Sequence, residues 1–250
     1  MNQYAETVVI AAFLSFCRVG ACFMLVPGLS SIRVPIQIRL FTALAVSFAL
    51  LATLWDQIVP FADRRPGILA PLIASELLIG GLMGLMTRFY ILSLQFMGSA
   101  IAMLVGFGGT SGPGIEDGEV ESAIGNLISF SALMLLFAFN FHHEVVRALV
   151  ESYTVAPVGL AFKPQAALIN LTDTLSDSFL LMLRIGSPFI AYAIIVNLTI
   201  GFVNKLTPQI PVYFISLPFV VTGGLFLLYF LIGTMLSFVA DSFVPLTIGR

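Results

Sequence analysis

The sequence predicts an all-α, polytopic membrane protein built from long, kinked helical hairpins. Hydrophobic residues make up 59% of the 250 residues and charged residues only 10%, and the mean hydropathy is +1.05. These values lie far outside the range of soluble globular proteins. In addition, about seven apolar stretches approach the roughly 20 residues that a membrane-spanning helix needs.

The expected helices follow one another along the chain with short connections. They cover residues 7–26, 40–61, 68–87, 89–105, 123–141, 179–202 and 212–239. Only Arg88 separates the third stretch from the fourth. Residues 142–177 form the most polar part of the chain and include Pro164 near an expected helix start. The last two stretches, joined by the short sequence LTPQIP, are typical of a helical hairpin, so we expect a boundary near residue 175.

Composition and motifs argue against several classes of function. The net charge is −2 and no basic patch occurs, so we expect no nucleic-acid binding. The glycine-rich segment lacks the basic residue of a phosphate-binding loop, and Ser111 stands where a dinucleotide motif needs its third glycine. The zinc-protease pattern HExxH fails at Arg147, which replaces the second histidine. Cys17 and Cys22 lie too far out of helical register to form a metal clip or a disulfide. We therefore expect no enzyme activity, no cofactor and no metal site.

A stripe of small and charged residues runs along the third expected helix. Glu76, Gly80, Gly84 and Arg88 recur every four residues and share one helical face. The glycines permit a close helix neighbour, while the ionisable ends are costly in lipid and should face protein or water. The stripe therefore has two interpretations: a packing seam, or a direct role in conduction.

Further charged and polar residues occur at membrane depth. Asn197, Gly201 and Lys205 form a second stripe, Arg184 lies farther up the same expected helix, and Arg18 lies within the first apolar stretch. The apolar stretches contain too few acids to pair all these bases internally. Pairing between subunits is the most economical hypothesis.

The segment GFGGTSGPGIEDGEVES, residues 106–122, interrupts the apolar sequence. Its first nine residues contain five glycines, and we expect such a segment to form no hydrogen-bonded ladder of its own. Irregular backbone at membrane depth persists only within protein or beside an aqueous cavity, so this loop is a connector outside the membrane or a mobile plug in a pore. Asp117, Glu119 and Glu121 are expected at the start of the next helix, where the helix dipole favours negative charge.

Four stretches, in this order, resemble the FliR family of flagellar biosynthesis proteins and its injectisome relatives, which belong to the type III secretion export gate. They are FCRVGACFMLVPGLSSIRVPIQIRL, ELLIGGLMGLMTRFYILSLQFMGSAIAMLVGFG, LISFSALMLLFAFNFHHEVVRALVESYTVAPVG and GSPFIAYAIIVNLTIGFVNKLTPQIPVYFISLPF. The resemblance implies an all-helical subunit in a complex with FliP and FliQ. It also implies a FliP-like part, residues 1–175, followed by a FliQ-like helical hairpin, residues 176–250.

The same resemblance implies a function and a location. The complex would lie in the bacterial inner membrane at the flagellar basal body, near FlhB and FlhA, and would conduct unfolded flagellar proteins. The plug would correspond to Gly106, Phe107, Gly108, Gly109, Thr110, Ser111, Gly112, Pro113 and Gly114, although the run of glycines departs from the relatives. The cytoplasmic entrance would correspond to Thr207, Pro208, Gln209 and Pro211.

Three other functions compete with a flagellar export gate. An injectisome subunit would have the same architecture. A small-solute secondary transporter would use Glu76 and the buried bases as its coupling site, but such transporters often have two related halves, and no second half is visible. An intramembrane enzyme lacks its catalytic residues.

Overall fold

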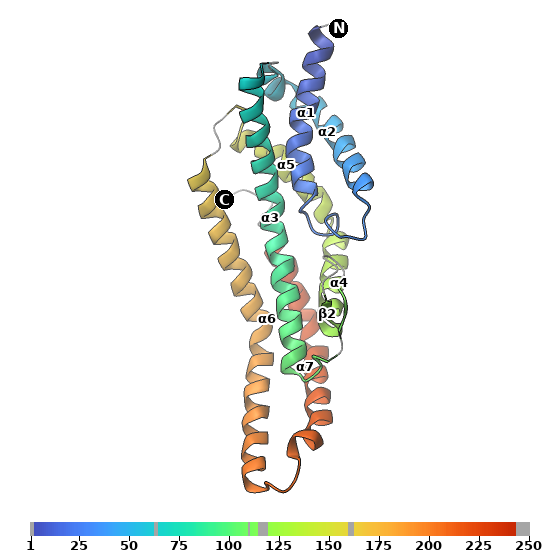
Figure 1. Cartoon of the computed structure of the whole chain (residues 1–250), viewed down its shortest axis with the longest axis vertical. Helices are drawn as coiled ribbons and strands as arrows, with labels where there is room; N and C mark the ends of the chain where they lie inside the picture. The colour runs from blue at the N-terminus through green and yellow to red at the C-terminus, as the bar shows by residue number, and fades with distance from the viewer. Residues whose placement is uncertain (1–2, 63–64, 110, 115–119, 160–162, 244–250) are drawn as a thin grey trace. The chain divides into compact units, whose positions relative to one another are not determined.

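The computed structural model describes residues 3–62, 65–109, 111–114, 120–159 and 163–243. Within these ranges the chain forms seven α-helices, one short 3₁₀ helix and a two-stranded ribbon (Figure 1). In chain order these are α1 (Gln3–Phe23), α2 (Ile36–Ile58), η1 (Val59–Phe61), α3 (Pro66–Leu104), β1 (Ser111–Pro113), β2 (Val120–Ser122), α4 (Ala123–Ala138), α5 (Phe141–Val155), α6 (Pro164–Leu206) and α7 (Val212–Phe243).

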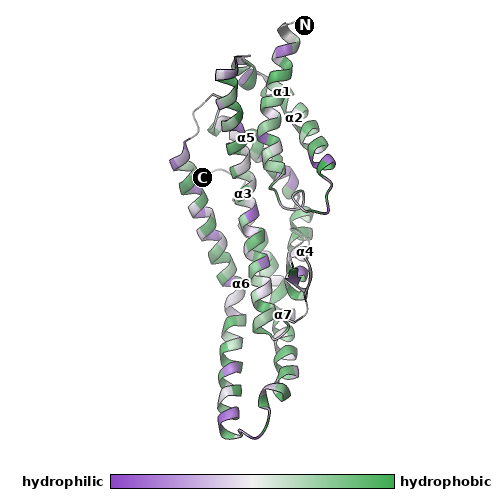
Figure 2. Ribbon diagram, in the orientation of Figure 1, coloured by the Kyte–Doolittle hydropathy of each residue, from purple (hydrophilic) through white to green (hydrophobic). Residues whose placement is uncertain are grey.

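The predicted all-α membrane architecture is confirmed. Five of the helices within the described part of the chain are long and apolar enough to cross a membrane, and the broken pair α4 and α5 would add a sixth span. Hydrophobic residues predominate along the helices (Figure 2). The three longest helices each contain one internal proline, at Pro71, Pro188 and Pro218.

The helices differ from the predicted stretches in three places. Arg88 does not interrupt α3, because arginine is a good helix former and leaves the backbone ladder intact. Helix α6 begins at Pro164 rather than near residue 179, and its first position suits the fixed φ of proline. The predicted stretch 123–141 ends at Asn140, whose left-handed φ of 57° stops α4 and precedes α5.

The described residues cluster into two compact units. The first draws mainly on Met1–Phe89 and Asn140–Leu175, and the second consists of Tyr90–Phe139 and Ser176–Ser242. Both units thus combine segments that are distant in the sequence. The division into a FliP-like part and a FliQ-like part at residue 175 describes sequence order and stays a prediction.

In the first unit, α5 buries one face of an amphipathic helix. Phe141, Val145, Leu149 and Tyr153 recur every four residues and are all buried. The segment after α5 turns at Gly159, whose φ of +87° is accessible to glycine and whose backbone lies against the ring of Phe61. This packing holds α5 in the same core as α1 and α2.

In the second unit, the end of α3 is fixed by a Schellman motif. Gly106 has a φ of +81°, its N–H donates to the carbonyl of Met103, and the N–H of Phe107 donates to the carbonyl of Ala102. The chain therefore leaves α3 in a defined direction before it enters the glycine-rich segment.

Candidate functional site

A buried ion pair joins α1 to α3 in the first unit. The side chains of Arg18 and Glu76 are 0% and 1% exposed. Arg18 Nε donates to Glu76 Oε2 at 2.6 Å, and Arg18 Nη2 donates to Glu76 Oε1 at 2.8 Å. Because both carboxylate oxygens accept from one guanidinium group, the pair has the fork geometry that makes such interactions strong and directional.

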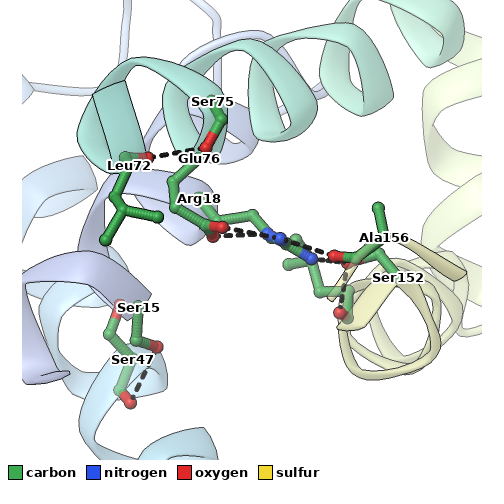
Figure 3. Close-up of polar contacts among 9 residues, drawn as sticks. Ser15, Arg18, Ser47, Leu72, Ser75, Glu76, Ser152 and Ala156 are labelled. Atoms are coloured by element: carbon green, nitrogen blue, oxygen red, sulfur yellow. Dashed lines mark hydrogen bonds and ion pairs between the residues drawn. The ribbon is translucent and has the colours of Figure 1, made fainter. Parts of the chain in front are cut away.

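The same guanidinium group also reaches the C-terminal end of α5. Arg18 Nη1 donates to Ser152 Oγ at 3.0 Å, and Nη2 donates to the carbonyl of Ala156, the residue that caps α5, at 2.9 Å (Figure 3). The guanidinium carbon lies 3.8 Å from the centre of the Tyr153 ring. A positive charge is favourable at a helix C-terminus and over an aromatic face, so Arg18 connects three helices.

Two glycines of α3 allow α1 to come close enough for this pair to form. A Cβ on Gly80 would overlap the carbonyl oxygen of Arg18, and a Cβ on Gly84 would lie 2.6 Å from the carbonyl oxygen of Cys22. Glu76, Gly80 and Gly84 thus contact α1 through one face, and this is the geometry of a helix-packing seam. Arg88, the fourth residue of the predicted stripe, is half-buried.

The other predicted charged and polar positions lie on α6. Arg184, Asn197 and Lys205 are exposed on the surface of the chain. The amide of Asn197 donates to the carbonyl of Ala193 in its own helix at 2.8 Å. Among the predicted charges, the structure brings Arg18 and Glu76 together, and the pairing of the α6 residues with other subunits stays a prediction.

The glycine-rich loop is partly ordered as a ribbon. Strand β1 pairs antiparallel with β2, with Ser111 opposite Ser122, Gly112 opposite Glu121 and Pro113 opposite Val120. The expectation that this loop forms no ladder is therefore wrong for its second half, because the acidic half of the segment supplies a partner strand. Thr110 lies outside the described residues.

The start of α4 agrees with the predicted stretch 123–141, and a hydroxyl group caps it. The helix begins at Ala123, and Ser122 caps it by accepting a hydrogen bond from the N–H of Gly125 at 2.9 Å. Glu121 lies before the cap, in β2, and its buried carboxylate accepts a hydrogen bond from Ser129 Oγ at 3.0 Å. The capping function thus belongs to a hydroxyl group, and Glu121 instead attaches the ribbon to α4. Asp117 and Glu119 lie outside the described residues.

The connection between α6 and α7 is a short exposed turn. Thr207, Pro208, Gln209 and Pro211 are all exposed. The N–H of Ile210 donates to the carbonyl of Thr207 at 3.1 Å, which closes the turn. The predicted hairpin connection is present, and its position at a cytoplasmic entrance stays a prediction.

Comparison with known proteins decides the family. The sequence profile of the family described as bacterial export proteins, family 1, matches residues 9–245. The chain belongs to this family.

Similar relatives of this export protein share most of its length. A protein of Caulobacter vibrioides is 31% identical over 231 residues, which cover 91% of each chain. A protein of Escherichia coli is 26% identical over 86% of this chain and 82% of its own, and one of Aquifex aeolicus is 29% identical over 90% and 86%. All three are named flagellar biosynthetic protein FliR.

In this export protein, the contacts of Arg18 with α5 were not predicted from the sequence. Ser152, Tyr153 and Ala156 lie in residues 142–177, which none of the expected helices covers. The repeat of Phe141, Val145, Leu149 and Tyr153 could have identified the buried face of α5. The hydrogen bonds from Arg18 to Ser152 and to the Ala156 carbonyl have no sequence signal, because they depend on how α1 packs against the end of α5.

Among the described residues of this export protein, no group of three or more His, Cys, Asp or Glu side chains is placed to hold a metal ion. His142 and His143 are exposed, and their rings lie 4.2 Å apart at the start of α5. The lack of a cofactor and of catalysis stays an expectation.

Proposed function

We propose that this chain is a subunit of the flagellar type III protein export gate in the bacterial inner membrane. It forms a protein-conducting pore with FliP-like and FliQ-like subunits at the flagellar basal body. The observation that carries the proposal is the similarity to proteins named FliR over 86–91% of the chain. The five candidate membrane spans fit a subunit of this kind.

The surface of the terminal helices supports assembly with other subunits. Helix α7 is the least buried of the five candidate spans. Only 11% of its 18-residue apolar segment is buried by the rest of the chain. Large apolar side chains cover it, and exposed members include Tyr213, Phe214, Phe219, Phe226 and Tyr229. Such a surface needs lipid or protein as cover.

The charged residues of α6 favour protein as part of that cover. Arg184 and Lys205 are exposed on a helix that also exposes many apolar side chains. A charge at membrane depth needs a paired group or water, which acidic groups of FliP-like or FliQ-like subunits would supply. FlhB and FlhA are the further proposed partners, and unfolded flagellar proteins are the proposed cargo.

The loop at residues 106–114 is proposed to be the plug of the pore. Its glycines permit close backbone approach and positive φ values, and Phe107 supplies bulk. The contacts of Glu121 on α4 would hold the returning strand while the glycine-rich half yields.

The ion pair of α1 and α3 argues against the transporter alternative. A coupling carboxylate must be reached by its ion or proton during transport. Both oxygens of Glu76 are instead bonded to Arg18, and the side chain is 1% exposed. The pair therefore fits a structural joint better than a coupling site.

The test is complementation in a strain that lacks this gene. Expression of the tagged chain should restore swimming in soft agar and release of flagellar filament protein into the medium. FliP-like and FliQ-like proteins should co-purify with it. Restored motility by a chain that purifies without these subunits would contradict the proposal.

Deletion of residues 108–112 tests the plug separately. A plug predicts that the assembled gate leaks small dyes or ions into cells, whereas a connector predicts normal sealing or failed assembly. Co-purification of the two partner subunits with the deletion variant distinguishes an open gate from one that has not assembled.

A further inference from the structure

Helices α6 and α7 meet at Gly223 in the second unit. The hydroxyl of Tyr192 in α6 donates a hydrogen bond to the carbonyl of Val220 in α7 at 2.8 Å. A Cβ on Gly223 would lie 2.5 Å from this hydroxyl oxygen. The absence of a side chain at Gly223 is therefore what admits the hydroxyl group of Tyr192 to the backbone of α7.

The end of α3 packs on the adjacent glycine. Val105 is wholly buried, and a Cβ on Gly224 would overlap its side chain. At the next residue, a Cβ on Gly106 would lie 3.3 Å from Leu217 and 3.6 Å from Val221. The base of the glycine-rich loop thus lies directly on α7.

This part of α7 also contains residues that weaken a helix. Pro218 removes one backbone hydrogen bond within the helix. Gly223 and Gly224 have low helix propensity, and the carbonyl of Val220 is shared with Tyr192. Prolines and glycines are the usual sites of helix bending, so the deformable segment of α7 coincides with the position of the loop base.

We propose that Gly223 and Gly224 form a seat for the loop that begins at Gly106, and that the backbone conformation of α7 at this seat sets where the loop lies. Tyr192 is a positioning residue, since its hydroxyl fixes α6 against the seat. The conformation of α7 is thus linked to the position of the loop by direct packing, and this link does not depend on which molecules pass through the assembly.

The test uses the purified assembly and a cysteine introduced in the loop. Gly109→Cys is suitable because a Cβ there meets nothing within 4 Å. The two natural cysteines, Cys17 and Cys22, are buried and are replaced by alanine. The measurement is the rate at which a membrane-impermeant maleimide labels Gly109→Cys.

Three variants report on the seat. Tyr192→Phe removes the hydroxyl alone, and Gly224→Ala introduces a clash that Val105→Ala should relieve. Tyr192→Phe and Gly224→Ala should each change the labelling rate by at least about threefold, the factor expected from the loss of one hydrogen bond. The double variant Val105→Ala/Gly224→Ala should return to within about twofold of the parent, because the two sites are in contact and couple.

The matched control lies on the same helix. A Cβ on Gly233 meets nothing within 4 Å, so Gly233→Ala should leave the labelling rate unchanged. The proposal is overturned if Tyr192→Phe and Gly224→Ala both label at the parental rate, or if Gly233→Ala changes the rate as much as they do. If Gly224→Ala does not assemble, the rate for Tyr192→Phe alone decides.

Discussion

Replacement of Glu76 by alanine should destabilise the first unit by about 3–5 kcal/mol, the usual cost of removing one partner of a buried ion pair. Arg18 would remain 0% exposed without its carboxylate. Its bonds to Ser152 and Ala156 would persist, but these neutral acceptors do not compensate the buried positive charge.

An exposed pair of the same chemistry provides the matched control. Arg147 Nε and Glu151 Oε1 lie 3.0 Å apart on α5, and their side chains are 63% and 42% exposed. Glu151→Ala should therefore cost only about 0.3–0.5 kcal/mol, as is usual for exposed pairs one helical turn apart. The comparison isolates burial, because each variant removes a glutamate that pairs with an arginine.

The assay is equilibrium unfolding of the purified protein in detergent, followed by tryptophan fluorescence. The chain has a single tryptophan, Trp55 in α2, so the signal reports on the first unit. The double variant Arg18→Met/Glu76→Leu should recover most of the loss, because apolar side chains of similar size can replace a buried pair. The reasoning is refuted if Glu76→Ala costs no more than Glu151→Ala.

Three other substitutions test separate features. Gly80→Ala should abolish the monodisperse peak of the protein in size-exclusion chromatography, because the added Cβ would overlap a carbonyl oxygen of α1. Gly81→Ala is the control and should be tolerated, because a Cβ at Gly81 has no neighbour within 4 Å. Gly106→Ala should lower the free energy of unfolding by about 1–2 kcal/mol in thermal unfolding, because Gly106 has a left-handed φ. Gly109→Ala is the control and should cause no loss of stability, because a Cβ there has no neighbour within 4 Å. Ser129→Ala should accelerate hydrogen exchange at the start of α4, since it deletes a bond to a buried carboxylate worth about 1.5–3 kcal/mol; an unchanged rate would contradict the attachment of β2 to α4.

Hydrophobic length was sufficient to predict the membrane class and most helices. Apolar stretches of membrane length leave few alternatives, because backbone groups in lipid must bond within their own segment. Helix boundaries were less predictable. The amphipathic α5 buries one face, so it depends on tertiary packing more than on the weak local preferences of its residues. The start of α6 is polar and mostly exposed, and therefore has no apolar pattern that would mark it in the sequence.

The candidate site was predictable only in part. The spacing of Glu76, Gly80 and Gly84 identified one face of α3 from the sequence alone. The partner of Glu76 could not be identified, because Arg18 is 58 residues away in the chain and four bases at membrane depth competed for few acids. The ribbon of β1 and β2 was also missed, since the three residues of β1, Ser-Gly-Pro, have low strand propensity and no strand signal until their partner strand is known.

The length of α3 has a consequence for how the protein is made. Its 39 residues correspond to about 58 Å of helix at 1.5 Å per residue, whereas a bilayer core of about 30 Å accommodates roughly 20 residues. Nearly half of this helix is therefore longer than the hydrocarbon layer requires. In addition, only 28% of its 18-residue apolar segment is buried by the chain itself. Newly synthesised chains would expose most of this apolar segment until lipid or the proposed partner subunits cover it, so their survival in the cell should depend on the timing of partner synthesis.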